Sequence, residues 1–401
     1  MSIESRTTAG EGLFGLFNDS FPPIIDGVTL TVQNYAKWLG ERDMTPCVVT
    51  PRNPVSEPTD YDVIRYFSLP IAWRRPYRYG YPKLDPYIWR KLRNTPFRLV
   101  HAHCPFSSGR LAVYVKKKQG VPLIGTFHSK YRSDLAHGFR HTPWCVPIIM
   151  KRILDFFNAC DEVWIPQAKV EETVREYGFK GKLTVVENGN DFADMVPSSD
   201  VMAHKSAVRR RLNMDDGSLN LLFVGQHIWE KGLRVIIDAL EELDRRKVSF
   251  RMNFIGMGYA LEEARDIVAV KGLADRVKFL GMITDRSVLA DYYAASDLFL
   301  FPSYYDNAPL VLREAAAFGT PGILVKGSTA SEVISNDSNG FLVDCAGPAY
   351  ATLVEWLSHD RDRITATGSN ARSTLVRSWS NVVEEVADRY NTLIRIHSRN
   401  L

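Results

Sequence analysis

The chain has 401 residues, of which 45% are hydrophobic and 24% charged, and its formal net charge is +4. A chain of this length is too long for one ordinary hydrophobic core, so we expect two or three domains. The composition is that of an ordinary soluble globular protein. The excess of basic residues is too small to indicate nucleic-acid binding by itself.

In the first half of the chain, short apolar runs alternate with amphipathic stretches. Within 29–43, apolar residues recur at helical spacing, which predicts the first helix. Further helices are predicted at 84–93, 108–119, 146–158 and 168–177. The apolar runs predict strands at 13–17, 47–49, 97–103, 122–127, 162–166 and 182–187. This alternation is typical of parallel sheets with helices on both faces.

A polar stretch at 189–217, which contains a proline and a basic helical segment, interrupts the pattern. Alternation then resumes, with strands predicted at 219–225, 251–256, 277–281, 297–302 and 322–325 and helices at 233–243 and 259–270. The chain ends in an amphipathic helix. We therefore predict an α/β protein with two Rossmann-like, doubly wound parallel-sheet domains, residues 1–195 and 196–378, followed by a C-terminal helix in 379–401.

The stretch PSYYDNAPLVLREAAAFGTP, residues 302–321, places two acidic residues where a ligand is expected. Asp306 lies in the loop after the strand 297–302, Pro309 suits the first turn of a helix, and Gly319 suits its end. Glu314 lies inside that helix. Because open α/β sheets bind ligands outside the carboxyl ends of their strands, and helix N-termini attract anions, we expect both acids to line a ligand site.

Other motifs make this pattern specific. Gly-Thr-Pro at 319–321, Glu332-Val333 and Asn339-Gly340 follow Glu314 in order. Further matching segments are FPPIIDGV (21–28), HAHCPFSSG (101–109), TFHSKY (126–131), VENGND (186–191), FVGQHIWEKG (223–232) and YYAASDLFLFPS (292–303). Over nearly its whole length the chain resembles the family-four retaining glycosyltransferases with the GT-B fold. The resemblance implies an acceptor-binding domain and a nucleotide-sugar-binding domain facing across a cleft, with the C-terminal helix crossing back to the first domain.

The resemblance also implies roles for individual residues. Those expected to be catalytic are His128, Lys231 and Asp306. Those expected to bind the donor are Gly27, Gln226, Lys231, Asn307, Ala308, Pro309, Leu310 and Glu314. Those expected on the acceptor side are Asp26, His103, Ser107 and Tyr131.

Two positions depart from the family pattern. Gln226 stands where the family usually has Arg, so a neutral donor replaces a charged one toward phosphate. Asp306 stands where the family usually has a longer Glu, which puts the choice of sugar in doubt. His227 either compensates for the missing charge at Gln226 or is a structural residue, and the sequence leaves both open.

The implied reaction is transfer of a hexose, with retention of configuration, from a nucleotide-sugar to an acceptor hydroxyl. We expect a UDP-sugar as donor. We also expect a membrane lipid such as diacylglycerol as acceptor, because residues 71–94 and 138–157 combine basic and aromatic residues. A soluble or cell-wall glycan acceptor and a non-catalytic nucleotide-sugar-binding protein are the alternatives. The sequence GMGYAL at 256–261 lacks the third glycine of a dinucleotide-binding loop, which argues against an oxidoreductase.

No metal, cofactor or nucleic-acid partner is expected. The five cysteines, at 47, 104, 145, 160 and 345, are scattered and fit neither a disulfide framework nor a zinc site. The N-terminal residues lack the apolar core of a signal peptide, and no apolar run reaches the length of about 18 residues that spans a bilayer. We therefore expect a cytoplasmic protein, with peripheral contact to the inner face of the membrane as an open alternative.

Overall fold

A computed structural model describes residues 12–71, 76–139, 141–214 and 217–399 of the chain. The chain forms two compact units, one running to Gly189 and including the segment from Trp379, the other comprising Asn190–Ser378. Residues 1–11, which bear on the expected lack of a signal peptide, lie outside the described residues. So do residues 72–75 and 140 of the two basic and aromatic segments.

The first unit is built on a seven-stranded sheet in the order β3-β2-β1-β6-β7-β8-β9, and every described pair is parallel. Its strands are β1 (Leu13–Phe17), β2 (Pro46–Pro51), β3 (Asp62–Tyr66), β6 (Phe97–Ala102), β7 (Leu123–Thr126), β8 (Glu162–Ile165) and β9 (Leu183–Val185). A separate antiparallel pair is formed by β4 (Ser68–Pro70) and β5 (Arg78–Gly80). Because β1 is buried along its whole length, it reads in sequence as an unbroken apolar run.

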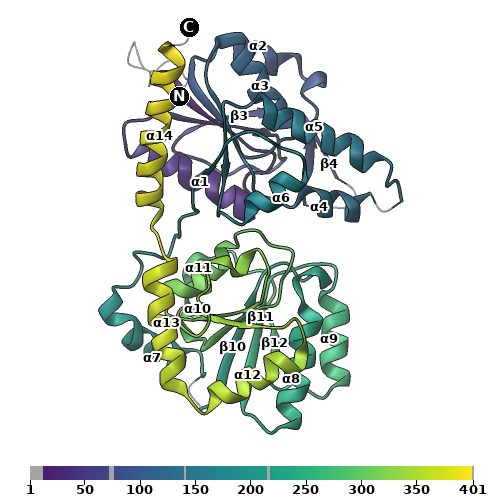
Figure 1. Cartoon of the computed structure of the whole chain (residues 1–401), viewed down its shortest axis with the longest axis vertical. Coiled ribbons are helices and arrows are strands. Elements are labelled where there is room, and N and C mark those ends of the chain that lie inside the picture. Colours follow the sequence, from purple (N-terminus) through teal and green to yellow (C-terminus); the bar gives the residue numbers. More distant parts are fainter. Residues whose placement is uncertain (1–11, 72–75, 140, 215–216, 400–401) are drawn as a thin grey trace. The chain divides into compact units, whose positions relative to one another are not determined.

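Helices cover both faces of this sheet (Figure 1). They are α1 (Gly27–Gly40), α2 (Pro86–Asn94), α3 (Ser107–Gln119), α4 (Tyr131–Gly138), α5 (Cys145–Ala159) and α6 (Val170–Glu176). The last helix of the chain, α14 (Trp379–Arg399), lies against α1. Its residue Tyr390 is fully buried and stacks on Phe14 of β1, with ring centroids 5.9 Å apart. The C-terminal helix thus completes the core of the unit that begins the chain.

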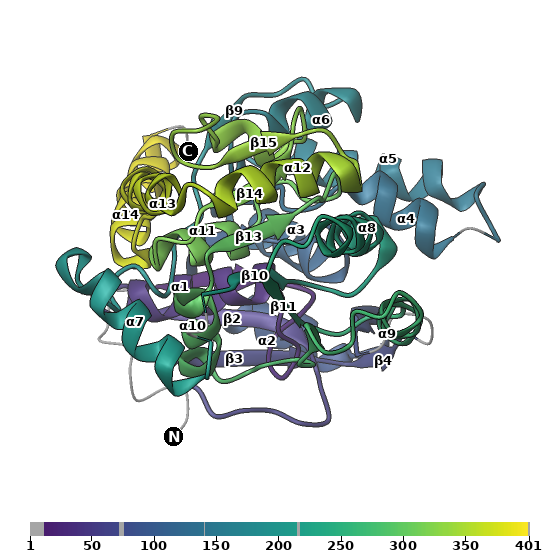
Figure 2. The ribbon, with the colours of Figure 1, turned by 90° about the horizontal axis from the view of Figure 1, so that it is seen from below.

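The second unit has a six-stranded parallel sheet in the order β12-β11-β10-β13-β14-β15. Its strands are β10 (Leu219–Val224), β11 (Phe250–Ile255), β12 (Val277–Phe279), β13 (Leu298–Phe301), β14 (Gly322–Val325) and β15 (Phe341–Val343). Its helices are α7 (Val201–Arg211), α8 (Leu233–Arg245), α9 (Leu261–Val270), α10 (Arg286–Ala295), α11 (Leu310–Ala317), α12 (Gly347–Ser358) and α13 (Arg361–Leu375). Within this unit, α8, α9 and α12 lie on one side of the sheet and α10, α11 and α13 on the other (Figures 1 and 2).

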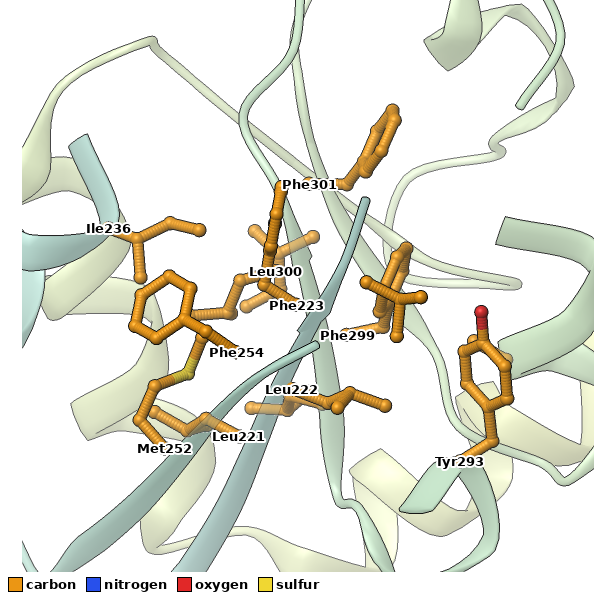
Figure 3. Packing of buried hydrophobic residues seen from close by; sticks show 14 of the residues in the cluster. Leu221, Leu222, Phe223, Ile236, Met252, Phe254, Tyr293, Phe299, Leu300 and Phe301 are labelled. Atoms are coloured by element: carbon orange, nitrogen blue, oxygen red, sulfur yellow. The ribbon is translucent and has the colours of Figure 1, made fainter. Parts of the chain in front are cut away.

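The core of the second unit fills both faces of its sheet. Figure 3 shows Met252, Phe254 and Ile236 to one side of the central strands and Tyr293 to the other. The side chains of β10 are buried throughout, so all residues of this strand except Asn220 are apolar and the strand shows no regular alternation. The two parallel sheets confirm the predicted α/β class.

Candidate functional site

The connections of the second sheet reverse direction between β10 and β13. These adjacent parallel strands end at the same edge, and β10 continues outward to β11 while β13 continues outward to β14. Ligands of open α/β sheets bind at such a switch point, outside the carboxyl ends of the strands. The segments that follow β10 and β13 contain most of the residues expected to bind the donor.

Gly232 allows the segment after β10 to pack closely against the segment after β13. A short 3₁₀ helix, Trp229–Lys231, ends at Gly232, which adopts φ +79° and precedes α8. A Cβ atom at this position would lie 2.5 Å from the carbonyl oxygen of Pro302, the first residue after β13. Only glycine tolerates both the left-handed conformation and this close approach. The contact places Lys231 beside the loop that carries Asp306.

Lys231 and Asp306 form an ion pair. Their side chains are 12% and 17% exposed, so the pair is largely shielded from water. The hydroxyl of Ser303 donates a hydrogen bond to the second carboxylate oxygen of Asp306 at 2.7 Å. The Lys231 ammonium also lies 5.6 Å from the ring centroid of Tyr305. The structure thus brings together two of the residues expected to be catalytic.

The loop that carries Asp306 leads directly into α11, and the N-terminus of this helix is uncapped. Pro309 is the N-cap residue, with φ −68° and ψ 125°, so the helix begins one residue later than the sequence indicated. Proline is compatible with either position because its fixed φ suits both. No side chain in the described part of the chain caps this end. Its first N–H groups and the positive end of the helix dipole therefore suit an anion.

Glu314 lies inside α11 and is buried, with its side chain 6% exposed. One carboxylate oxygen accepts a hydrogen bond from Arg286 Nη2 at 2.7 Å, and the other accepts one from the Tyr293 hydroxyl at 2.7 Å. Burial and the neighbouring carboxylate raise the pKa of Tyr293 well above its ordinary value. Burial lowers the pKa of Arg286, but the attraction of Glu314 and Asp191 outweighs it and the net pKa is raised.

Neither Arg286 nor Tyr293 was predicted as a site residue. Tyr293 lies in the motif YYAASDLFLFPS, which supported the family resemblance but assigned no role to this residue. Arg286 begins α10, outside every matching motif, and its sequence position carries no signal of its role. Both are found only through their contacts with Glu314.

Gln226 and His227 follow β10 and have opposite environments. Gln226 is exposed at the carboxyl end of the strand. His227 is fully buried among Phe223, Phe254 and Phe279, with ring centroids about 6 Å apart. Burial, with a smaller contribution from Arg265, lowers the pKa of His227 to about 4. A neutral, buried imidazole cannot supply the charge that Gln226 lacks, so the structural reading of His227 is the one that the geometry favours.

In the first unit, His128 lies just after β7, beside two histidines at the end of β6. Its Nε2 lies 3.1 Å from Nδ1 of His103, and the two rings stack at 5.4 Å. The His103 ring also stacks on His101 at 4.1 Å. Burial lowers the pKa of His128 to about 4, and burial together with the adjacent histidines lowers that of His103 well below its ordinary value. Both rings are therefore neutral near pH 7.

Asp26 and Gly27 form the start of α1. The Asp26 carboxylate caps the helix by accepting a hydrogen bond from the Thr29 backbone N–H at 2.7 Å, and it also accepts one from Ser20 Oγ at 3.2 Å. Gly27 is the first helical residue. The structure places both between β1 and α1, at the carboxyl edge of the first sheet, where a ligand loop was expected.

Two residues expected on the acceptor side, Ser107 and Tyr131, are buried and have contacts within the first unit. Ser107 is buried, and its hydroxyl donates to Asp19, which also accepts from the Ser108 backbone N–H at 3.0 Å. Burial raises the pKa of Asp19 despite these hydrogen bonds. Tyr131 is 3% exposed and packs in the core against Phe127, with ring centroids 5.1 Å apart. Ser107 therefore belongs to the capping of α3 by Asp19, and Tyr131 belongs to the hydrophobic core.

Two further observations bear on cofactors and membranes. Across residues 12–71, 76–139, 141–214 and 217–399, the His, Cys, Asp and Glu side chains form no group of three or more that could hold a metal ion. In the same residues, no helix combines the length and apolar character required to traverse a bilayer.

Comparison with known proteins agrees with this geometry. The model of the family described as Glycosyltransferase Family 4 matches residues 25–194, and that described as Glycosyl transferases group 1 matches residues 204–374. The alpha-monoglucosyldiacylglycerol synthase of Streptococcus pneumoniae is 24% identical over 346 residues, which are 85% of this chain and 78% of that protein. The D-inositol 3-phosphate glycosyltransferase of Corynebacterium kroppenstedtii is 29% identical over 312 residues, 75% of this chain and 68% of that protein.

A solved structure shows the same fold. The crystal structure of Anabaena Alr3699/HepE in complex with UDP and glucose has a TM-score of 0.74 and 18% identity, and the match covers 95% of this chain and 99% of that one. The two family models are matched in chain order, the first almost entirely on the first parallel-sheet unit and the second within the second unit. The chain therefore belongs to the family-four glycosyltransferases and has the GT-B fold.

Proposed function

We propose that this glycosyltransferase moves a hexose from a UDP-sugar to a hydroxyl of a membrane lipid such as diacylglycerol, with retention of configuration. The observation that carries the proposal is the arrangement at the carboxyl ends of β10 and β13. There Lys231, Asp306 and the uncapped start of α11 come together, with Glu314 further along the same helix. The bound UDP and glucose in the structure of Alr3699/HepE support the choice of donor.

Lys231 and the N-terminus of α11 supply the positive charge that the leaving diphosphate needs. Negative charge grows on this group as the bond between the sugar C1 and the phosphate oxygen breaks, and preorganised cations and helix N–H groups stabilise it. The acceptor oxygen forms the new bond to C1 on the same face, and its proton passes to the departing diphosphate oxygen. No carboxylate of the protein forms a covalent intermediate in this scheme, and no metal or other cofactor takes part.

Asp306, Glu314 and His128 orient the donor. Asp306 contacts sugar hydroxyls, and its carboxylate is released from Lys231 when the diphosphate takes over that cation. Glu314 accepts hydrogen bonds from the ribose. His128 is neutral near pH 7, because burial lowers its pKa to about 4, so its imidazole serves as a hydrogen-bonding group to the sugar rather than as a cation.

The start of α5 supports a membrane-bound acceptor. We call Trp144, Ile148, Lys151 and Arg152 the α5 surface: Trp144 and Ile148 are 69% and 49% exposed, and the two basic side chains are exposed in the next turn. Exposed apolar groups beside cations suit the boundary of an anionic membrane. The name of the relative from Streptococcus pneumoniae, a monoglucosyldiacylglycerol synthase, points to the same class of acceptor.

A soluble phosphorylated polyol is the second candidate acceptor. It is favoured by the relatives named D-inositol 3-phosphate glycosyltransferase, one of which is 29% identical to this chain. A glycan acceptor and a non-catalytic nucleotide-sugar-binding protein are further alternatives. The three enzymatic alternatives share the donor site and differ only in the acceptor.

Thermal-shift measurements with UDP-, GDP- and ADP-sugars test the donor. A donor at about 100 times its Kd adds roughly 2.7 kcal/mol of stability, so the correct sugar nucleotide gives a clear shift. We expect Lys231→Ala and Glu314→Ala to abolish that shift, whereas Arg246→Ala, at the residue that follows α8, keeps it. A shift that survives both site substitutions would place the donor elsewhere.

Turnover then tests the acceptor and the stereochemistry. The purified protein is incubated with the donor and either diacylglycerol vesicles, inositol phosphate or a glycan mixture, and the product is examined by NMR. We expect an α-linked glycolipid from an α-linked donor. A β-linked product would exclude retention, and donor binding without transfer to any acceptor would favour the binding protein.

A further inference from the structure

Arg286 connects the buried carboxylate of Glu314 to Asp191 within the second unit. Its Nη2 atom lies 2.7 Å from Glu314 Oε1 and 3.0 Å from Asp191 Oδ2. The centre of its guanidinium lies 4.2 Å from the ring centroid of Phe192. Two carboxylates and an aromatic ring therefore fix the orientation of this side chain, although a third of it, 33%, is exposed.

Glu314 depends on such a partner. Its side chain is 6% exposed, and burying a carboxylate is costly unless a cation and hydrogen-bond donors replace the solvent. Arg286 supplies the cation, and the Tyr293 hydroxyl supplies a second donor at 2.7 Å on the other oxygen. These two hydrogen bonds fix the orientation of the Glu314 carboxylate.

The two hydrogen bonds leave the carboxylate with unused acceptor capacity. Each oxygen of an ionised carboxylate accepts two hydrogen bonds, and Arg286 and Tyr293 occupy one on each. One lone pair on each oxygen remains, which matches two hydroxyls on neighbouring carbons. The ribose of a nucleotide carries such a pair.

We propose that Arg286 is a positioning residue for nucleotide recognition: it holds the carboxylate of Glu314 in one orientation, so that the carboxylate accepts hydrogen bonds from both ribose hydroxyls. This inference rests on the proposed function, because it takes a nucleotide as the ligand of Glu314. Arg286 itself need not touch the ligand. A purely structural role, in which Arg286 ties α10 to the segment at Asp191, is the alternative.

The ligand 2′-deoxy-UDP separates the two roles, since it lacks one of the hydroxyls. We would measure the affinities of UDP and 2′-deoxy-UDP by calorimetry for the unmodified protein, Arg286→Ala, Arg286→Lys and Arg246→Ala. Losing a hydrogen bond to a charged group costs about 10- to 100-fold in affinity, so the unmodified protein should prefer UDP by that factor. Arg286→Ala should bind UDP more weakly and lower the preference below about threefold.

Arg246→Ala is the matched control, because Arg246 pairs with Glu242 and Glu355 on other elements of the same unit and should leave the preference unchanged. Arg286→Lys keeps the charge with a different reach and should restore part of the preference, which also covers the case in which the alanine variant does not fold. A variant that binds UDP more weakly yet keeps the full preference over 2′-deoxy-UDP would overturn the inference and favour the structural role. An unmodified protein that binds UDP and 2′-deoxy-UDP equally would overturn the inference alone. The absence of UDP binding would reject the proposed donor as well.

Discussion

Lys231 is paired with Asp306 at the carboxyl ends of β10 and β13, so the cation expected to bind diphosphate has a carboxylate partner before any donor arrives. Asp306 is itself held by Ser303, whose hydroxyl lies 2.7 Å from its second oxygen. A shielded pair of this kind is stable only while both partners are present. Under the proposed function, an incoming diphosphate replaces Asp306 on Lys231, and the released carboxylate becomes available to the sugar.

This relationship predicts opposite effects of Asp306→Asn on binding and turnover. The neutral amide no longer competes for Lys231 or repels the phosphates, so UDP should bind about three- to tenfold more tightly at low salt. The rate of sugar transfer should fall at least about tenfold, because the carboxylate that orients the sugar is lost. Calorimetry with UDP and steady-state kinetics measure the two quantities. Weaker UDP binding in this variant would show that Asp306 does not compete with the diphosphate.

Gly232 should tolerate alanine poorly. The substitution combines a left-handed backbone with a Cβ atom 2.5 Å from the Pro302 carbonyl oxygen. Left-handed strain costs about 1–2 kcal/mol and overpacking a further 1–3 kcal/mol or so, and the loop would carry Lys231 out of place. We expect a loss of roughly 2–5 kcal/mol in urea unfolding and the loss of UDP-induced stabilisation.

Gly272→Ala is a matched control for this prediction. Gly272 belongs to the same unit and has φ +71°, but a Cβ atom there would meet nothing within 4 Å. It should cost only the strain of about 1–2 kcal/mol and keep the response to UDP. Equal losses in the two variants would mean that the contact between Gly232 and Pro302 is not what fixes the loop.

The sequence predicted the inner strands of both sheets well, because a strand buried on both faces consists mostly of apolar residues. β10 and β14 are of this kind. The strand β3 was not predicted, since it lies at the edge of its sheet and only two of its five residues are buried. The helix α13 was also missed, because its residues are largely polar and Gly368 lies in its interior.

The residues of the site can likewise be separated into those that the sequence could predict and those that it could not. Lys231 and Asp306 stand in motifs whose order along the chain identifies the strand ends, so their meeting could be anticipated. Arg286 and Asp19 could not, because neither stands in a matching motif and only the fold brings each to its partner. Ser107 and Tyr131 stand in matching motifs as well, but the motifs did not indicate that their side chains are buried.

The α5 surface should bind anionic vesicles. Replacing Trp144 and Ile148 with Asp removes exposed apolar area and adds negative charge, so both terms that favour the membrane are weakened. We expect co-sedimentation with vesicles containing phosphatidylglycerol at low salt to fall at least about fivefold. Val270→Asp, at an 88% exposed residue of α9 in the other unit, is the control for added charge. Unchanged sedimentation of the Trp144 and Ile148 variant would remove the support for this surface.

The neutral histidines at the ends of β6 and β7 should make the first unit acid-sensitive. Burial lowers the pKa of His128 to about 4 and takes those of His101 and His103 well below the ordinary value. Between about pH 6.5 and pH 4 the unfolded chain therefore binds more protons at these sites than the folded chain does, so stability falls as the pH falls. His128 alone should account for about 1 kcal/mol between pH 7.5 and pH 5.5.

Calorimetric unfolding at these two pH values tests the sign and the size of the effect. His128→Asn removes one titrating group, so its transition should shift less between pH 7.5 and pH 5.5 than that of the unmodified protein, whatever its absolute stability. His359→Asn, at an exposed residue of the second unit, should leave the pH response of the first unit unaltered. If the unfolding temperature of the first unit rose on acidification, this would mean that His128 gains a proton in the folded state. The proposal of a neutral imidazole at the donor sugar would then be wrong.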